Sequence, residues 1–357
     1  MNTNDPVAEL ARCNDARWDH ITKAASAAAH QRAELITRIS ERHEHLLAQS
    51  SEQEMEVVVF GSLGRDEWTS GSDVDWTLLI DGRADLEHFH AANVVGQAID
   101  ENRKPGAAGI FGNMAFSHEI IHRIGGHEDT NRNITQRVLL LLEGRPLARQ
   151  DAGHHGPYGR VVSTILERYL QSGSQECRDS EWKPPRFLIN DLVRYWRTMC
   201  VDFAWKEWER DSEKWGTRNI KLRMSRKLIF AAGLLACLEP SVQSGANYSL
   251  NQHEGRERLF ANFSQTPLRL IAQFLLDSGN GEQGDPLARK LFGKYDEFLG
   301  ALDDTDTRKV LDKAAPSKQT EVYRDCKKLS DEFQDALVEL FFERNELSSL
   351  VREYGVF

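Results

Sequence analysis

The chain has 357 residues, which is enough for about two domains. Hydrophobic residues make up 40% of it and charged residues 28%, so a core can form and global disorder is excluded. With 45 Lys and Arg against 55 Asp and Glu, the formal net charge of −10 excludes a generally basic surface, although not a local basic patch.

Two further features exclude classes of protein. No apolar run approaches the roughly 18 to 20 residues of a membrane helix, and the first residues, MNTNDPVAEL, lack the pattern of a secretory signal. The five cysteines are scattered and include no C-x-x-C pair, which favours reduced thiols over a disulfide framework or a zinc ribbon. We therefore expect a cytoplasmic protein without a membrane-spanning segment.

The chain divides into three predicted parts. Residues 1–54 are predicted to form an N-terminal helical segment, in which Asp5 suits the N-cap and Pro6 the first helical position. Residues 55–150 alternate short strands with helices and predict a domain built on a β-sheet. Residues 151–357 have helical periodicity almost throughout, which predicts an all-helical accessory or substrate-binding domain.

The most informative stretch lies in the middle part. An apolar run over 57–60 predicts a buried strand, the bend GSLGRDEWTSGS follows, and DVDWTLLI over 73–80 predicts a second strand. In the second strand Asp73 and Asp75 alternate with apolar residues and therefore point to the same side. Two carboxylates so close repel each other unless a cation lies between them, which points to Mg²⁺ bound together with phosphate oxygens.

The glycine bend supplies a second part of such a site. Gly61 and Ser62 end the first strand and open a turn whose backbone N–H groups could hold a triphosphate. Together with the aspartates, this arrangement predicts metal-assisted phosphoryl or nucleotidyl transfer. The alternative is a turn rich in Gly, Ser and Asp that only joins two strands.

The string VVVFGSLGRDEWTSGSDVDWTLLI resembles the nucleotidyltransferase signature of the DNA polymerase β superfamily. Its spacing is most similar to the catalytic domain of bacterial PII-uridylyltransferase and its uncharacterised relatives, and a fainter similarity continues to about residue 147. The resemblance implies an α+β fold with a mixed β-sheet. It also implies that Asp73 and Asp75 are catalytic and bind Mg²⁺ or Mn²⁺. The residues that it implies for nucleotide binding are Gly61, Ser62, Arg65 and Ser72.

Many members of that superfamily carry a third carboxylate on a later strand, and here no obvious one follows. Glu119 and Asp129 are the candidates. Glu119 also belongs to His118-Glu119-Ile120-Ile121-His122, which matches the H-E-x-x-H pattern of zinc peptidases. We expect two histidines on a short surface helix instead, because no third ligand follows at a familiar spacing.

The segment 183–227 differs in charge from the rest of the chain. It holds twelve Lys or Arg and six Asp or Glu, a local charge of +6, whereas the remainder carries −16. Asn190, Arg194 and Arg197 have the spacing of one helical face, and four tryptophans lie among the charges. This segment could bind a triphosphate or a polynucleotide. Alternatively, its aromatic residues are core and its charges are solvated.

These patterns predict a Mg²⁺-dependent nucleotidyltransferase. It would move a nucleoside monophosphate from a nucleoside triphosphate, such as ATP, to a hydroxyl of a protein, an RNA or a nucleotide, releasing pyrophosphate. The alternative is a catalytically weak nucleotide-binding regulatory module that keeps the fold. The sequence does not identify the acceptor, the nucleotide or the oligomeric state.

Overall fold

The computed structural model of the chain divides into two compact units. One unit is Ala24–Ser174, and the other combines Met1–Lys23 with Gln175–Phe357. None of the helices in the described ranges combines the length and apolar character needed to cross a bilayer. The residues described are 5–43, 46–47, 54–105, 110–147, 156–171, 181–209, 213–242, 250–280 and 284–356.

A four-stranded mixed sheet forms the centre of the first unit. Its order is β3-β2-β1-β4, with β1 antiparallel to β2 and β4, and with β2 parallel to β3. Pairing of Val59 with Trp76 sets the register of the two central strands. The strands are β1 (Met55–Val59), β2 (Trp76–Ile80), β3 (Asn113–Phe116) and β4 (Arg145–Pro146).

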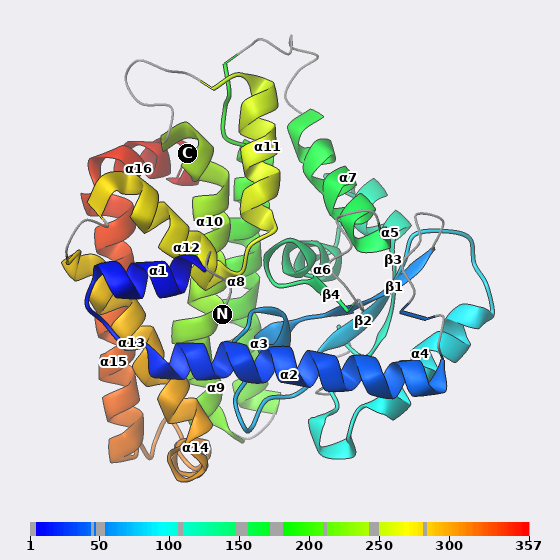
Figure 1. Cartoon of the computed structure of the whole chain (residues 1–357), viewed down its shortest axis with the longest axis horizontal. Helices are drawn as coiled ribbons and strands as arrows, with labels where there is room; N and C mark the ends of the chain where they lie inside the picture. Colours follow the sequence, from blue (N-terminus) through cyan, green and yellow to red (C-terminus); the bar gives the residue numbers. More distant parts are fainter. Residues whose placement is uncertain are drawn as a thin grey trace. The chain divides into compact units, whose positions relative to one another are not determined.

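One face of the sheet is apolar and packs on helices α2 (Asp19–Arg42) and α4 (Glu87–Ala98). Val57 and Val59 of β1 share this face with alternate residues of β2, because side chains point to opposite sides of a strand in turn. Figure 1 shows the C-terminal part of α2 lying along the sheet, with α4 beside its end. This core holds one face of the predicted Asp-bearing strand in place.

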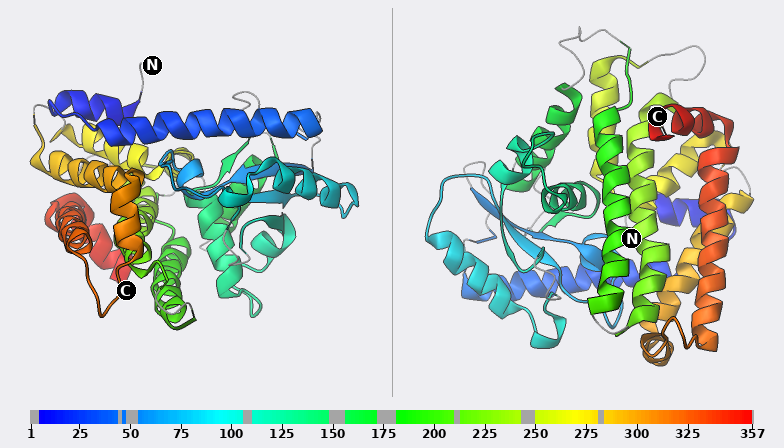
Figure 2. Two further views of the ribbon diagram at one scale, coloured as in Figure 1. Left: turned by 90° about the horizontal axis from the view of Figure 1, so that it is seen from below. Right: turned by 180° about the vertical axis from the view of Figure 1, so that it is seen from behind.

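Helices α5 (Ser117–His122), α6 (Asn131–Leu142) and α7 (Pro157–Gln171) cover the opposite face, as Figure 2 shows. Thr77 and Ala115 line a small cavity there together with Leu139 of α6. The α7 backbone is tied to the sheet because Tyr158 N–H donates to Glu56 Oε2 at 2.8 Å. These contacts explain why α7 belongs to the same compact unit as the sheet. The predicted domain bounds of 55–150 stay a prediction.

The second unit is helical, and α10 (Lys227–Val242) runs through its core with nearly every residue buried. Helices α8, α11 and α12 pack against α10, while α13 packs against α15. The other helices of this unit within the described ranges are α1 (Pro6–Cys13), α8 (Arg186–Glu209), α9 (Trp215–Lys221), α11 (Gln252–Phe263), α12 (Pro267–Leu275), α13 (Pro286–Asp303), α14 (Thr305–Asp312), α15 (Glu321–Val338) and α16 (Asn345–Leu350).

The predicted α+β class is confirmed, with a mixed sheet and a C-terminal helical region. The N-terminal helical segment consists of two helices, because Asp15 takes a left-handed conformation (φ 48°) between α1 and α2. The end of the predicted helical domain is likewise divided after α15. Widened turns at Glu339–Glu343 and Val351–Val356 flank α16 there.

A substitution at Gly64 tests how closely the glycine bend packs against the end of α6. A Cβ at this position would lie 2.1 Å from the backbone oxygen of Glu143, which cannot move without displacing α6. We expect Gly64→Ala to lower the free energy of unfolding by about 3 kcal/mol. Gly96→Ala in α4 is the control, because its nearest neighbour would be 3.9 Å away. The control should gain about 0.5–1 kcal/mol. Equal urea midpoints for the two variants would contradict this packing.

Candidate active site

The glycine bend and the aspartate pair meet where β1 and β2 begin to separate. Phe60 N–H donates to the backbone oxygen of Asp75 at 2.9 Å, which extends the pairing one residue beyond the strands. Gly61 then turns with φ +62°, a conformation that favours glycine. A Cβ on Gly61 would lie 2.7 Å from Asp75 Oδ2. The start of the bend therefore contacts the second carboxylate, although 14 residues separate them.

Asp73 and Asp75 are held in an extended segment. Val74 between them donates its N–H to the backbone oxygen of Arg103 at 2.8 Å and buries its side chain in the apolar core. Trp76 is buried in the same core, so the aspartates lie on the other side, with Asp73 exposed and Asp75 half-buried. This is the alternation that the sequence predicts, while the roles of the two carboxylates remain predictions.

Two of the predicted nucleotide-binding residues, Arg65 and Ser72, bond to other residues of the chain. Arg65 is buried and forms ion pairs with Glu67, at 2.9 Å, and with Glu143. Ser72 is also buried, and its hydroxyl accepts a hydrogen bond from Thr69 N–H at 3.1 Å. These contacts shape the bend from within. Nucleotide binding by Gly61, Ser62, Arg65 and Ser72 remains a prediction.

Asp66 is a residue of the bend that the sequence analysis did not single out. It takes a left-handed conformation (φ 64°) and pairs with Arg32 of α2 and Arg145 of β4, both at 2.7 Å. Arg32 also donates to the backbone oxygen of Leu63 at 2.6 Å, and burial lowers the pKa of its guanidinium. The bend is thus fixed to a helix and to a strand that lie far from it in the sequence.

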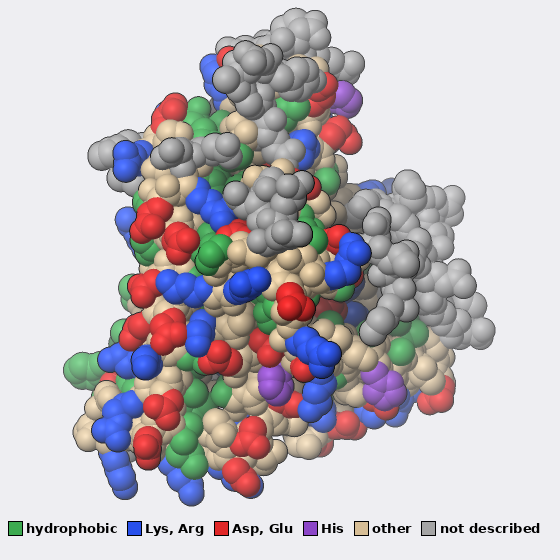
Figure 3. All heavy atoms as spheres, turned by 60° about the vertical axis from the view of Figure 1, so that its left-hand side comes forward, with side chains coloured by type: hydrophobic (Ala, Val, Ile, Leu, Met, Phe, Trp, Pro, Cys, Tyr) green, Lys and Arg blue, Asp and Glu red, His purple; other side chains and the backbone are tan. Residues whose placement is uncertain are grey.

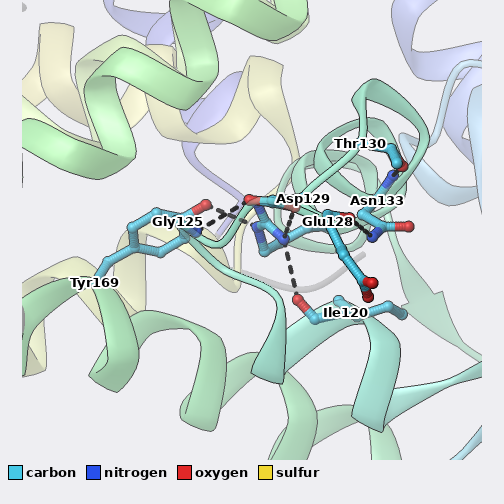
Figure 4. A network of polar contacts seen from close by, with 8 residues as sticks. Ile120, Gly125, Glu128, Asp129, Thr130, Asn133 and Tyr169 are labelled. Atoms are coloured by element: carbon cyan, nitrogen blue, oxygen red, sulfur yellow. Dashed lines mark hydrogen bonds and ion pairs between the residues drawn. The ribbon is translucent and has the colours of Figure 1, made fainter.

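Asp129, a candidate third carboxylate, belongs to a buried polar network. The fully buried Arg137 donates to both carboxylate oxygens of Asp129, at 2.8 and 3.2 Å. It also donates to the backbone oxygen of Ile120 at 3.0 Å and to the hydroxyl of Tyr169 at 2.7 Å. Figure 4 shows Asp129, Ile120 and Tyr169 converging in this network. The carboxylate of Asp129 therefore balances the buried positive charge of Arg137.

Glu119, the other candidate, is exposed on α5 and lies 3.5 Å from Arg123. His118 and His122 are exposed beside it, with ring centroids 4.6 Å apart. Within the described ranges, these histidines belong to no group of three metal-ligating side chains. The residue of β3 that pairs with Thr77 of β2 is Asn113. The side chain at this position of the sheet is therefore an amide and not a carboxylate.

The basic segment 183–227 forms α8, α9 and the start of α10. Asn190, Arg194 and Arg197 are all exposed on α8, as their spacing predicts. Of the aromatic residues, Tyr195 and Trp215 are core, whereas Trp205 and Trp208 are exposed. The aromatic residues are thus divided between core and surface, and binding of a triphosphate or polynucleotide by this segment remains a prediction.

Arg223 and Lys227, at the end of this segment, contact α15. Arg223 donates to the hydroxyl of Ser330 at 2.6 Å and pairs with Asp331, while Lys227 donates to Gln334. Burial lowers the pKa of Lys227 to about 8, so it stays mostly charged at pH 7 but loses its proton at a lower pH than an exposed lysine. On the face drawn in Figure 3, Lys and Arg side chains lie interspersed with Asp and Glu.

Comparison with known families gives a match over the part of the chain that carries these residues. Residues 41–104 match the family model of the nucleotidyltransferase domain. The matched range includes β1, the glycine bend, both aspartates, β2 and α4. It supports a transferase of nucleoside monophosphates in general, while the similarity to PII-uridylyltransferase remains a prediction. No curated protein and no solved structure matches the chain.

The buried pair of Asp129 and Arg137 gives a test of stability. We expect Asp129→Ala to lower the free energy of unfolding by about 3–5 kcal/mol, because it leaves the Arg137 charge buried without its carboxylate. The control is Glu128→Ala, whose side chain is 81% exposed. It should change stability by less than about 0.5 kcal/mol. Urea denaturation measures both, and equal midpoints would show that Asp129 is not needed for folding.

Proposed function

We propose that the chain is a Mg²⁺-dependent nucleotidyltransferase. It transfers a nucleoside monophosphate from a nucleoside triphosphate to a hydroxyl and releases pyrophosphate. The observation that carries this proposal is the approach of Gly61 to the Asp75 carboxylate, inside the range that matches the nucleotidyltransferase domain. The turn that would hold phosphates thereby adjoins a carboxylate that would hold a metal ion.

The donor set fits Mg²⁺, with Mn²⁺ as the alternative ion. Asp73 and Asp75 would hold it, because both carboxylates lie on one side of the same extended segment and oxygen ligands suit a hard cation. When bound, the ion supplies positive charge against the triphosphate and the negative charge that develops in the transition state.

The residues of the bend would position the triphosphate. Gly61 has no side chain, so the backbone of the bend can approach the triphosphate closely beside Asp75. We propose that Ser62 binds the phosphates, and that Arg65 and Ser72 support the bend through their contacts with Glu143 and Thr69. The acceptor oxygen then bonds to the α-phosphorus as pyrophosphate leaves. Catalysis of such a transfer depends mainly on alignment and electrostatics.

We propose that the acceptor is a protein, an RNA or a nucleotide that contacts the basic segment 183–227. The exposed Arg194 and Arg197 support this, since guanidinium groups bind phosphates, and Trp208 is 89% exposed and could stack on a base. We also propose a cytoplasmic location, on the scattered cysteines of the sequence.

The second candidate is a catalytically weak nucleotide-binding regulatory module. It is favoured by the missing third carboxylate: the sequence has no Asp or Glu between Glu101 and Glu119, and Asp129 pairs with a buried arginine. Such a module would bind a nucleoside triphosphate with Mg²⁺ and turn it over slowly or not at all.

Removing either aspartate should abolish transfer. Incubation with each labelled nucleoside triphosphate and Mg²⁺ measures the label that appears on protein, RNA or nucleotide. We expect Asp73→Asn and Asp75→Asn each to lose at least about 100-fold in rate, because the cation loses a ligand. Asp73→Asn should not lower the melting temperature, because it removes one of two repelling carboxylates and Asp73 is exposed.

The control is Glu101→Gln, whose side chain is 87% exposed, and its rate should equal that of the unchanged protein. Wild-type turnover in either aspartate variant would refute the proposed site. Mg²⁺-dependent nucleotide binding without any transfer by the unchanged protein would instead select the regulatory module.

The charge of α8 gives a test of the acceptor. If Arg197 contacts phosphates, binding of single-stranded RNA should weaken steeply as salt rises, since each contact releases counterions. Arg197→Glu should weaken RNA binding and flatten that salt dependence. Arg324→Glu on α15 is the matched charge reversal at an exposed arginine, and it should keep both values. Identical salt slopes for the two variants would exclude Arg197 from the binding surface.

A further inference from the structure

Three side chains with metal-binding chemistry meet away from the aspartate pair. His43 follows the last residue of α2, and Glu87 and His90 lie in the first turn of α4. Their ligand atoms all lie within 4.8 Å of one another, which is true of no other such group of three in the part of the chain that the structure describes. Figure 1 shows the end of α2 beside α4.

The local geometry brings the three groups to one point. Glu87 and His90 are three residues apart on a helix and so share one side of α4. His43 Nε2 lies 3.2 Å from Glu87 Oε1, and the rings of His43 and His90 have centroids 5.7 Å apart. Two imidazoles and one carboxylate thus converge from two helices that are separated by more than forty residues.

His43 is largely buried, and its contact with Glu87 uses only one ring nitrogen, Nε2. Its side chain is 17% exposed, and its Nδ1 atom is buried with no hydrogen-bond partner among the described residues. The exposed Glu87 and His90 leave the cluster open to an ion from solvent.

We propose that His43, Glu87 and His90 bind a zinc ion. Two imidazole nitrogens and one carboxylate oxygen are a donor set that Zn²⁺ takes with a water in the fourth position. Mg²⁺ prefers a set made of oxygen atoms, so the two sites differ in the ion that they select.

The spacing of the ligand atoms suits this ion after a small rearrangement. Tetrahedral Zn²⁺ with bonds of about 2.0–2.2 Å places its ligand atoms about 3.4 Å apart. Separations of up to 4.8 Å contract to this value when exposed side chains rotate, and both Glu87 and His90 are exposed.

The zinc site lies apart from the proposed catalytic pair. Asp73 and Asp75 precede β2, whereas Glu87 follows it, so the length of the strand separates the two clusters along the chain. A bound ion would link the end of α2 to the start of α4 and thus close the segment that carries β1, the bend and β2. We therefore assign the ion a stabilising role that does not depend on the proposed transfer activity.

The test is a zinc titration of the tag-free full chain by calorimetry in excess Mg²⁺, which competes with Zn²⁺ for the aspartate pair. We expect one Zn²⁺ per chain and a higher melting temperature in its presence, because the ion binds the folded state. His90→Ala should weaken zinc binding at least about tenfold, since it removes a ligand. Glu87→Gln should also weaken it, and this variant can still bond to His43 Nε2, so misfolding would not explain the loss.

The control is the double variant His118→Ala with His122→Ala, which removes a neighbouring pair of histidines elsewhere on the described surface and should keep wild-type affinity. Zinc binding lost in this double variant but kept in His90→Ala would overturn the proposal. The absence of stoichiometric binding by the unchanged protein would overturn it as well.

Discussion

The contact between the backbone of Gly61 and the carboxylate of Asp75 is the constraint on which the site depends. It exists because the antiparallel pairing of β1 with β2 continues through the bond from Phe60 N–H to the backbone oxygen of Asp75. A larger residue at 61 would meet both a left-handed conformation and a carboxylate oxygen at 2.7 Å. Strand pairing therefore decides which groups can reach a shared ligand.

Buried and half-buried ion pairs hold the rest of the bend in one conformation. Arg65 bonds to Glu67 and Glu143, and Asp66 bonds to Arg32 and Arg145. Charges in a low-dielectric interior must be paired, because an isolated buried charge is strongly destabilising. These pairs connect the bend to α2, to the end of α6 and to β4. Alignment of a triphosphate would thus rest on helices distant in sequence from the bend.

The two ends of β2 carry different ligand chemistry. The carboxylates that precede the strand suit a hard cation with oxygen ligands, and the imidazoles near the start of α4 suit a borderline cation such as Zn²⁺. The first set would act on a substrate, and the second would join two helices. Selection between the ions would follow from the donor atoms.

The sequence by itself determined the α+β class, the two central strands and the side on which Asp73 and Asp75 lie. It could do so because alternation along a strand is a local property, read from Val74, Trp76 and their neighbours. It also indicated the exposed face of α8 from the spacing of Arg194 and Arg197.

Only the tertiary structure decided how distant side chains pair. It placed Asp129 against Arg137, Arg65 against Glu143, and His43 beside Glu87 and His90. It also showed that Lys227 is partly buried and bonded to α15, although the sequence presents it as one charge in a basic cluster. These outcomes depend on burial and on contacts between elements far apart in the chain. Local periodicity in the sequence predicts neither the burial of a charge nor its distant contacts. The free energy of a charged group depends on the surroundings that it meets after folding.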